Sequence, residues 1–327
     1  MNNIKKIGLT ALAGSLVAIS AQAAEMSVNG ATMLTYTSED GTEVTGNPFG
    51  MKTNLAFTAS GEVNGYNVSY YQASQDQFAG MSSARLSVDM GDMGTIAFDQ
   101  GSGSGLATID DKTPTAAEEI WDGLDVTTSG RVGAAGSSGV FNYINTFEGV
   151  TLNAAARKGS GTSNSDGASS GVGQGAWDFA LTADGSMLGV DGLAIGAGYG
   201  EAENGAFATG GDNAHTTAFA NYSVGPVTFG YQMSYEHNNV SATDDEETKA
   251  WGLAFNVNEN LSISYGERDV VFRGQGAGDV TEKGDGIAVA YTMGSMKIAG
   301  NMNEGSNMGG VSAANDSMTE IAVSFAF

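Results

Sequence analysis

Cysteine, basic residues, proline and long apolar runs are scarce or missing in this sequence. The 327 residues include no cysteine, which excludes a disulfide framework, a thiolate zinc site and a cysteine nucleophile. The 13 Lys and Arg residues face 37 Asp and Glu residues, and a chain with a formal charge of -24 lacks the basic surface that nucleic-acid binding requires. After residue 24 no apolar run is long enough for a transmembrane helix.

Glycine and aromatic residues, in contrast, are plentiful. The chain carries 49 Gly, 14 Phe, 11 Tyr and 3 Trp. A disordered acidic protein is poor in aromatic residues. The composition therefore indicates an ordered, acidic and glycine-rich protein.

Residues 1–23 have the pattern of a secretory signal peptide. Lys5 and Lys6 precede an apolar stretch at 7–19, and Ala21-Gln22-Ala23 forms a small-residue cleavage site. The alternative, a transmembrane anchor, is disfavoured because the apolar stretch is short. We therefore expect a mature domain at 24–327, and the loss of two lysines from thirteen leaves it eleven basic residues.

The mature chain alternates apolar with small or polar residues, which is the period of a β-strand. The stretch 227–236 is a clear example, and no stretch shows a helical apolar period. The alternation predicts an all-β protein with about sixteen strands, at 26–36, 51–61, 66–73, 83–90, 95–99, 140–147, 150–157, 176–183, 193–199, 215–222, 227–236, 249–257, 261–266, 286–292, 296–302 and 318–327.

Short and long connections alternate between these strands, and both termini lie on the short side. This asymmetry predicts a transmembrane antiparallel β-barrel and disfavours a soluble sandwich, which has no reason to alternate loop lengths. Aromatic residues gather at strand ends, as the two interfaces of a membrane require. At the ends next to the long loops, the predicted aromatic girdle consists of Trp177, Trp251, Tyr199, Tyr235 and Tyr265.

Three stretches are similar to Gram-negative general diffusion porins of the alphaproteobacterial type. DMGDMGTIAFDQ resembles the turn into their fifth strand, GVFNYINTFEGVTLNAAARKG resembles their strand six to seven hairpin, and the ending SMTEIAVSFAF resembles their assembly signal, with Phe327 last. The resemblance implies an outer-membrane homotrimer, inserted by the barrel-assembly machinery, whose long third loop folds into the lumen. One departure is Asp99-Gln100, where many porins have Gly-Arg, which makes the wall less basic there.

The third loop, at about 100–139, is the candidate pore constriction, because long loops without structure of their own are usually functional. Strand parity places three bases of the pore wall on the lumen face: Lys52, Arg85 and Arg157. The resemblance implies a transverse field between them and the acidic loop. The alternative for the loop is a solvated acidic loop outside the barrel. The alternative for the three bases is a polar lumen without a designed field. The acidic residues of the loop are Asp110, Asp111, Glu118, Glu119, Asp122 and Asp125.

The sequence offers little for catalysis. His215 and His237, with Ser234 and Asp212 near them in sequence, could form a hydrolase site. They are better explained as ordinary polar residues in or near loops. We expect no enzyme, no cofactor and no metal site. The predicted function is passive, cation-preferring diffusion of ions and small hydrophilic solutes through a barrel embedded in outer-membrane lipid. A substrate-selective channel and a surface adhesin or structural barrel without conductance are the alternatives.

Overall fold

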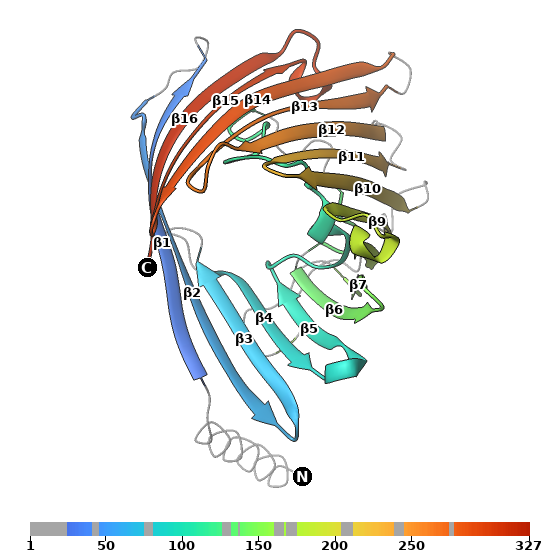
Figure 1. The fold of residues 1–327 in the computed structure, drawn as a ribbon. Helices are drawn as coiled ribbons and strands as arrows, with labels where there is room; N and C mark the ends of the chain where they lie inside the picture. The colour runs from blue at the N-terminus through green and yellow to red at the C-terminus, as the bar shows by residue number, and fades with distance from the viewer. Residues whose placement is uncertain are drawn as a thin grey trace.

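The computed structural model describes residues 25–40, 46–74, 81–125, 132–136, 138–159, 167, 175–203, 212–238, 245–274 and 278–327. In these residues sixteen antiparallel β-strands close into one barrel, seen nearly end-on in Figure 1. The predicted signal peptide lies outside the described residues. The strands are β1 (Glu25–Glu39), β2 (Phe49–Val63), β3 (Tyr66–Ser74), β4 (Met81–Asp89), β5 (Thr95–Gln100), β6 (Ser138–Phe147), β7 (Val150–Arg157), β8 (Ala176–Asp184), β9 (Leu193–Ala202), β10 (Asn213–Val224), β11 (Val227–His237), β12 (Asp245–Asn256), β13 (Leu261–Arg273), β14 (Val280–Met293), β15 (Met296–Ser306) and β16 (Asn315–Ala326).

Each strand pairs with its neighbours in sequence, and the first strand pairs with the last. Between β1 and β16, Ala31 lies opposite Ala326 and Tyr36 opposite Ile321. The C-terminal residue extends this seam, because the backbones of Gly30 and Phe327 exchange two hydrogen bonds of 2.9 Å. Closure leaves no sheet edge, so the backbone polar groups of the strands are satisfied within the wall.

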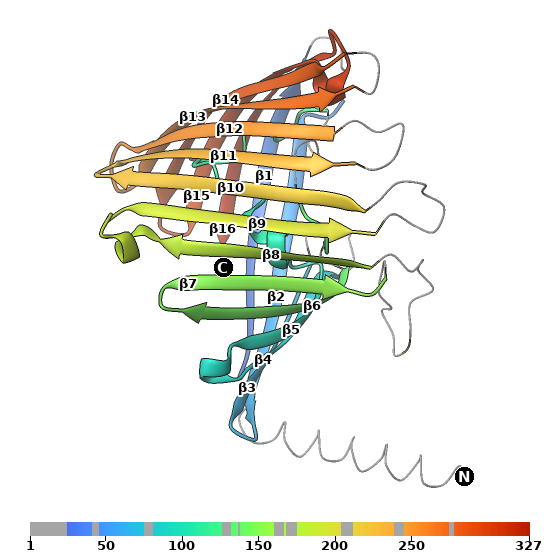
Figure 2. The same cartoon turned by 90° about the vertical axis from the view of Figure 1, so that its right-hand side faces the viewer.

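One end of the barrel carries tight turns, as the side view in Figure 2 shows. Two of them have both central residues at positive φ, as hairpin turns that match the strand twist require. These are Asn64-Gly65, with φ of 54° and 85°, and Glu148-Gly149, with φ of 48° and 83°. Two other turns contain the short 3-10 helices η1 (Gly91–Met93) and η3 (Gly185–Leu188).

The predicted strands and the alternation of connections are confirmed, but several strands extend further at the long-loop end. β13 continues to Arg273, past the predicted residue 266, and β14 begins at Val280 instead of 286. These extensions carry charges on both faces, so they lack the apolar alternation on which the prediction depends. Glu267 faces Asp285 and Asp269 faces Lys283 across the two strands.

The two faces of the wall differ in chemistry. On β11, the exposed Phe229 and Tyr231 alternate with the buried Gly230 and Gln232. The buried side is the inner face of the barrel, and it is buried because a chain segment covers it. Among the described residues, no helix is long and apolar enough to cross a membrane.

Candidate functional site

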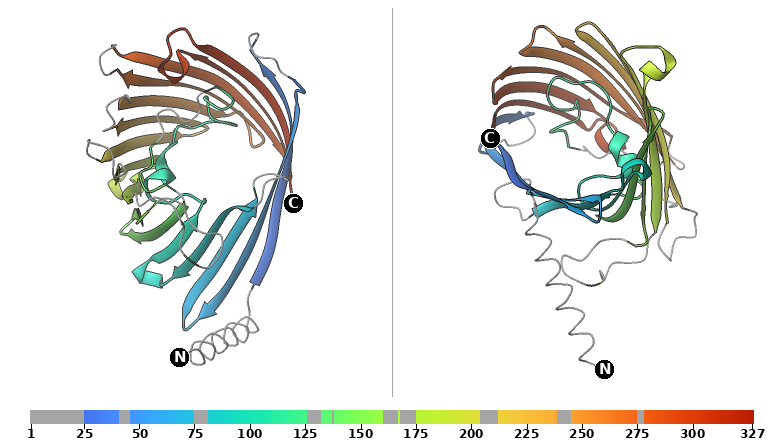
Figure 3. Two further views of the ribbon diagram at one scale, coloured as in Figure 1. Left: turned by 180° about the vertical axis from the view of Figure 1, so that it is seen from behind. Right: turned by 60° about the horizontal axis from the view of Figure 1, so that its bottom comes forward.

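The segment that covers the inner face is the connection between β5 and β6. We call it the inner loop (101–136, of which 101–125 and 132–136 are described). Figure 3 shows it within the ring of strands, following the wall. Its 3-10 helix η2 (Gly105–Ile109) buries Leu106 and Ile109 against Ala180 of β8, together with Val132 from the far end of the loop.

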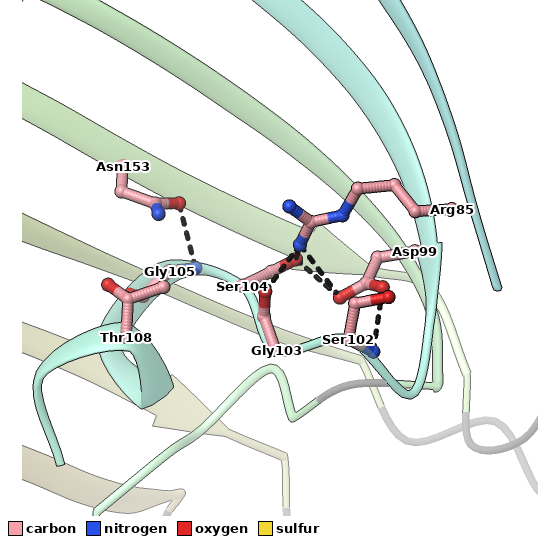
Figure 4. A network of polar contacts seen from close by, with 8 residues as sticks. All are labelled: Arg85, Asp99, Ser102, Gly103, Ser104, Gly105, Thr108 and Asn153. Atoms are coloured by element: carbon pink, nitrogen blue, oxygen red, sulfur yellow. Dashed lines mark hydrogen bonds and ion pairs between the residues drawn. The ribbon is translucent and has the colours of Figure 1, made fainter. Parts of the chain in front are cut away.

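The start of the inner loop is fixed by a network around Asp99, drawn in Figure 4. The carboxylate of Asp99, which is fully buried, accepts hydrogen bonds from Ser104 Oγ at 2.7 Å and from the backbone N–H of Ser102 at 3.0 Å. Arg85 Nη2 pairs with the same carboxylate at 3.2 Å and also donates to the carbonyl of Gly103. Arg85 therefore lies on the inner face, where Asp99 balances its charge at the start of the loop.

Asp178 on β8 joins the two ends of the inner loop. Its side chain accepts hydrogen bonds from the backbone N–H of Leu106 at 3.0 Å and of Ala135 at 2.7 Å. Gly105 has φ of +57°, and a Cβ at this position would overlap the carboxylate, so the approach requires glycine. The charge of Arg157, the predicted wall base on β7, acts on the same carboxylate.

The middle of the inner loop is bound to the wall by the amides of two strands. Gln232 of β11 accepts from Lys112 N at 2.6 Å and donates through Nε2 to the carbonyl of Ile109 at 2.8 Å. Asn221 of β10 donates to the carbonyl of Lys112 at 2.7 Å. Because backbone groups of the loop are used, these contacts fix its path whatever its side chains are.

The distal part of the inner loop reaches the strands that close the barrel. Ser264 Oγ on β13 accepts from Ala116 N at 2.8 Å. Asn303 of β15 donates to the carbonyl of Asp122 at 2.8 Å, and Asp316 of β16 accepts from Asp125 N at 2.6 Å. The inner loop therefore follows the wall from β5 to β16.

Three of the six predicted acidic residues lie together, and the wall adds a fourth. The pKa of Glu118 is raised above 4.5, first by burial and then by the charges of Asp122 and Glu119, and Glu320 of β16 adds to the same effect. Asp110 and Asp111 lie earlier in the loop, where Gln232 binds the carbonyl of Asp110 at 3.1 Å. Parity alone could have identified Glu320 as inward-facing, because it precedes the exposed Ile321.

Two lysines lie close to this acidic group. Lys52, the predicted wall base of β2, acts electrostatically on Glu320. Lys297 of β15 lowers the pKa of Glu118, against the larger effects that raise it. Lys297 was not among the predicted wall bases, although it stands between Met296 and Ile298 on the strand, and Ile298 is exposed on the outer face.

A charged pair that the sequence did not reveal lies beneath the inner loop. Arg268 of β13 and Glu282 of β14 form an ion pair of 3.2 Å, and both side chains are almost fully buried. The Arg268 guanidinium lies 4.9 Å from the ring centroid of Trp121, and Glu282 also accepts from the backbone N–H of Gly309 at 2.8 Å. The pair joins the inner loop to η4 (Met308–Gly310), which lies between β15 and β16.

The five aromatic residues expected to form a girdle lie on the outer face, near the long-loop ends of their strands. Trp251 and Tyr265 have ring centroids 5.6 Å apart, and Trp177 and Tyr199 lie 5.8 Å apart. Their polar atoms donate toward the loop end: Tyr199 to Glu201 at 2.6 Å, Tyr265 and Trp251 to Glu267 at 2.9 and 3.2 Å, and Tyr235 to Asp245 at 2.8 Å. Aromatic rings followed by carboxylates toward the long-loop end are the arrangement expected at a membrane interface.

The two histidines make contacts with carboxylates of neighbouring strands. His215 Nδ1 lies 3.8 Å from Glu236, and His237 Nδ1 lies 3.0 Å from Asp245. The hydroxyl of Ser234 pairs with that of Thr217 at 2.8 Å. Within the described ranges, no group of three His, Cys, Asp or Glu side chains is arranged to hold a metal ion.

A closed antiparallel barrel with an apolar, aromatic-rimmed outer face and a polar inner face belongs to the class of transmembrane β-barrels. The sequence matches the Gram-negative porin family over residues 8–326, and the chain belongs to this family. The resemblance predicted from the sequence is thereby confirmed, and the family places the barrel in the outer membrane.

Solved structures have the same fold at low sequence identity. OmpT, an outer membrane protein of Vibrio cholerae, has a TM-score of 0.69 at 14% identity, over 93% of this chain and 98% of that chain. A trimer form of the same protein gives 0.68 at 14% identity, over 94% and 100%. A mutant of the Rh. blastica porin gives 0.62 at 15% identity, over 93% and 100%. No curated protein matches this chain in sequence.

Proposed function

We propose that this porin is a water-filled channel for the passive diffusion of ions and small hydrophilic solutes, and that it prefers cations. The inner loop narrows the pore, and its carboxylates act on the passing ions. The observation that carries the proposal is the grouping of Glu118, Glu119 and Asp122 of the inner loop with Glu320 of the wall.

The bases near this group are too few to cancel it. Lys52 and Lys297 act on its members, whereas Arg85 is paired with Asp99 at the root of the loop. At physiological salt, charges act over about 8 Å, which is comparable to the radius of a narrow pore. An excess of carboxylates over that distance enriches cations along the path.

The test is the reversal potential in a KCl gradient across a planar bilayer. Neutralising Asp110, Asp111, Glu118 and Glu119 together, as Asn or Gln, should shift it toward the anion side. A control that neutralises two acidic residues on the tight turns, Asp92 and Glu148, should leave the reversal potential unchanged. If the quadruple variant keeps the wild-type value, these four carboxylates do not line the narrow part of the pore.

The remaining features of the proposal concern biogenesis and chemistry. Residues 1–23 act as a cleaved signal peptide, the barrel-assembly machinery inserts the mature domain 24–327 into outer-membrane lipid, and three copies assemble. The trimer form of OmpT supports the last point. We further propose that the protein has no catalytic activity and uses no cofactor, since its family and fold are those of a channel.

The two alternative functions are outcomes of the same recordings. A substrate-selective channel would show current block that saturates with one solute. An adhesin or structural barrel would show no conductance at all. General diffusion predicts open-channel steps that many small solutes leave unblocked.

A further inference from the structure

Four glycines form a continuous row on the inner face of the wall. Gly230 of β11 lies opposite Gly252 of β12, Gly252 opposite Gly266 of β13, and Gly266 opposite Gly286 of β14. We call these four residues the glycine row. Glycine weakens a strand because it adds backbone entropy and packs no side chain. Four glycines in register across adjacent strands therefore need a reason in the packing.

At Gly252 the inner loop supplies that reason, and at the other three glycines it lies among the nearest atoms. A Cβ added to Gly252 would lie 2.6 Å from the carbonyl oxygen of Pro114 and 3.2 Å from its Cδ. A Cβ at Gly266 would lie 2.8 Å from the carbonyl oxygen of Trp251 in the wall and 3.3 Å from Ile120 Cγ2. One at Gly286 would overlap Asn303 Oδ1 and lie 3.2 Å from Ile120 Cα. The residues 114–120 therefore lie directly on the backbone of the row, closer than a wall with side chains would allow.

The wall cannot retreat from an added methyl group, whereas the inner loop can. Every strand of the row is hydrogen-bonded on both edges in the closed barrel. The inner loop is held here by bonds to side chains of the wall, such as that of Ala116 N to Ser264 Oγ at 2.8 Å, and not by a strand ladder. A side chain at Gly252 would therefore push Pro114 off the wall by about 0.9 Å to restore an ordinary separation of about 3.5 Å.

We propose that the glycine row sets the position of the inner loop and, through it, the open cross-section and ion selectivity of the channel. The four glycines act as positioning residues, because they determine where the carboxylates stand in the pore. This inference rests on the proposed channel function. It assigns a functional role to strand glycines that would otherwise be read as small lumen residues.

The experiment compares Gly252→Ala with Gly284→Ala in single-channel recordings. Gly284 is the control because it lies on the same face of β14, two residues from the row, and the nearest atom to an added Cβ is Glu304 O at 3.8 Å. We expect Gly252→Ala to lower the single-channel conductance, because the inner loop moves toward the lumen, and to shift the reversal potential. Gly284→Ala should keep both wild-type values. A folded Gly252→Ala barrel with wild-type conductance and reversal potential would overturn the inference.

A second measurement follows the position of the inner loop and does not depend on conductance. Thr115 Oγ1 and Ser264 Oγ lie 3.4 Å apart, and the chain has no native cysteine to interfere. The pair Thr115→Cys and Ser264→Cys should form a disulfide readily, and adding Gly252→Ala should slow its formation, whereas adding Gly284→Ala should not. Equal rates in the three backgrounds would refute the proposal. Absence of current in wild type and in Gly284→Ala would instead refute the channel function.

Discussion

Replacing Asp178 by alanine is expected to free both ends of the inner loop while the barrel stays closed. The side chain is 2% exposed and accepts hydrogen bonds from the backbone N–H of Leu106 at 3.0 Å and of Ala135 at 2.7 Å. Alanine leaves two buried N–H groups without their acceptor, at a cost of about 1–3 kcal/mol each. The two together amount to about 2–6 kcal/mol. At about 1.4 kcal/mol per factor of ten, even the lower limit raises the open population of the loop ends roughly thirtyfold.

Hydrogen exchange of peptides from 101–110 and 132–136 measures this opening directly. Both should exchange faster in Asp178→Ala, while peptides from the β11–β12 wall keep their protection. Asp178→Asn retains one acceptor oxygen and should give an intermediate rate. In single-channel recordings, Asp178→Ala should add current noise from movement of the inner loop. A folded Asp178→Ala protein whose loop peptides exchange at the wild-type rate would show that the carboxylate does not fix the loop.

Three further predictions concern titration, assembly and the membrane boundary. The pKa of Glu118 is raised above its usual value, so the folded protein binds this proton more tightly than the unfolded chain does. The free energy of unfolding therefore falls as pH rises from the pKa of the unfolded chain to that of the folded protein. Acidification should therefore begin to weaken cation selectivity at a higher pH than an ordinary glutamate would give, and Glu118→Gln should remove that step from a reversal-potential titration. A wild-type titration without the step would count against the acidic group. Deleting Phe327 removes two backbone hydrogen bonds at the barrel seam and should lower the fraction of heat-modifiable folded barrel, whereas secretion into the periplasm continues; normal folded levels would contradict an assembly role. In a Trp121→Phe background, which removes the tryptophan of the inner loop, the fluorescence of Trp177 and Trp251 should be quenched by headgroup-attached quenchers and little by iodide. Efficient iodide quenching would contradict their place in the girdle.

The barrel could be predicted from the sequence because its determinants are local. Outward apolar residues, inward small or polar residues and tight turns such as Asn64-Gly65 all act within a few residues of one another. The strand ends of β13 and β14 were missed because their charges no longer alternate with apolar residues. The departure at Asp99-Gln100 was visible in the sequence, and the structure explains it as the partner of Arg85.

The position of the inner loop on the wall could not be predicted, because its contacts join residues far apart in the chain. Asp178 binds Leu106 across 72 residues, and Gln232 binds Lys112 across 120. In the sequence, each of these wall residues looks like an ordinary polar residue that faces the lumen, and Gly252 looks like an ordinary small residue of a strand. Only the closed barrel brings them under one segment. The role of Glu320 was missed for the same reason, since it joins Glu118 only after β16 closes the wall.

The proposed function requires that the barrel conduct ions through an acidic, water-filled pore. Its most direct test is the single-channel current of the purified wild-type protein in a planar bilayer with a KCl gradient. We predict discrete open-channel steps and a reversal potential of cation sign, and we expect the cation preference to weaken as salt rises, because salt screens the carboxylates. A folded barrel that produces no steps, or one with a reversal potential of anion sign, would contradict it.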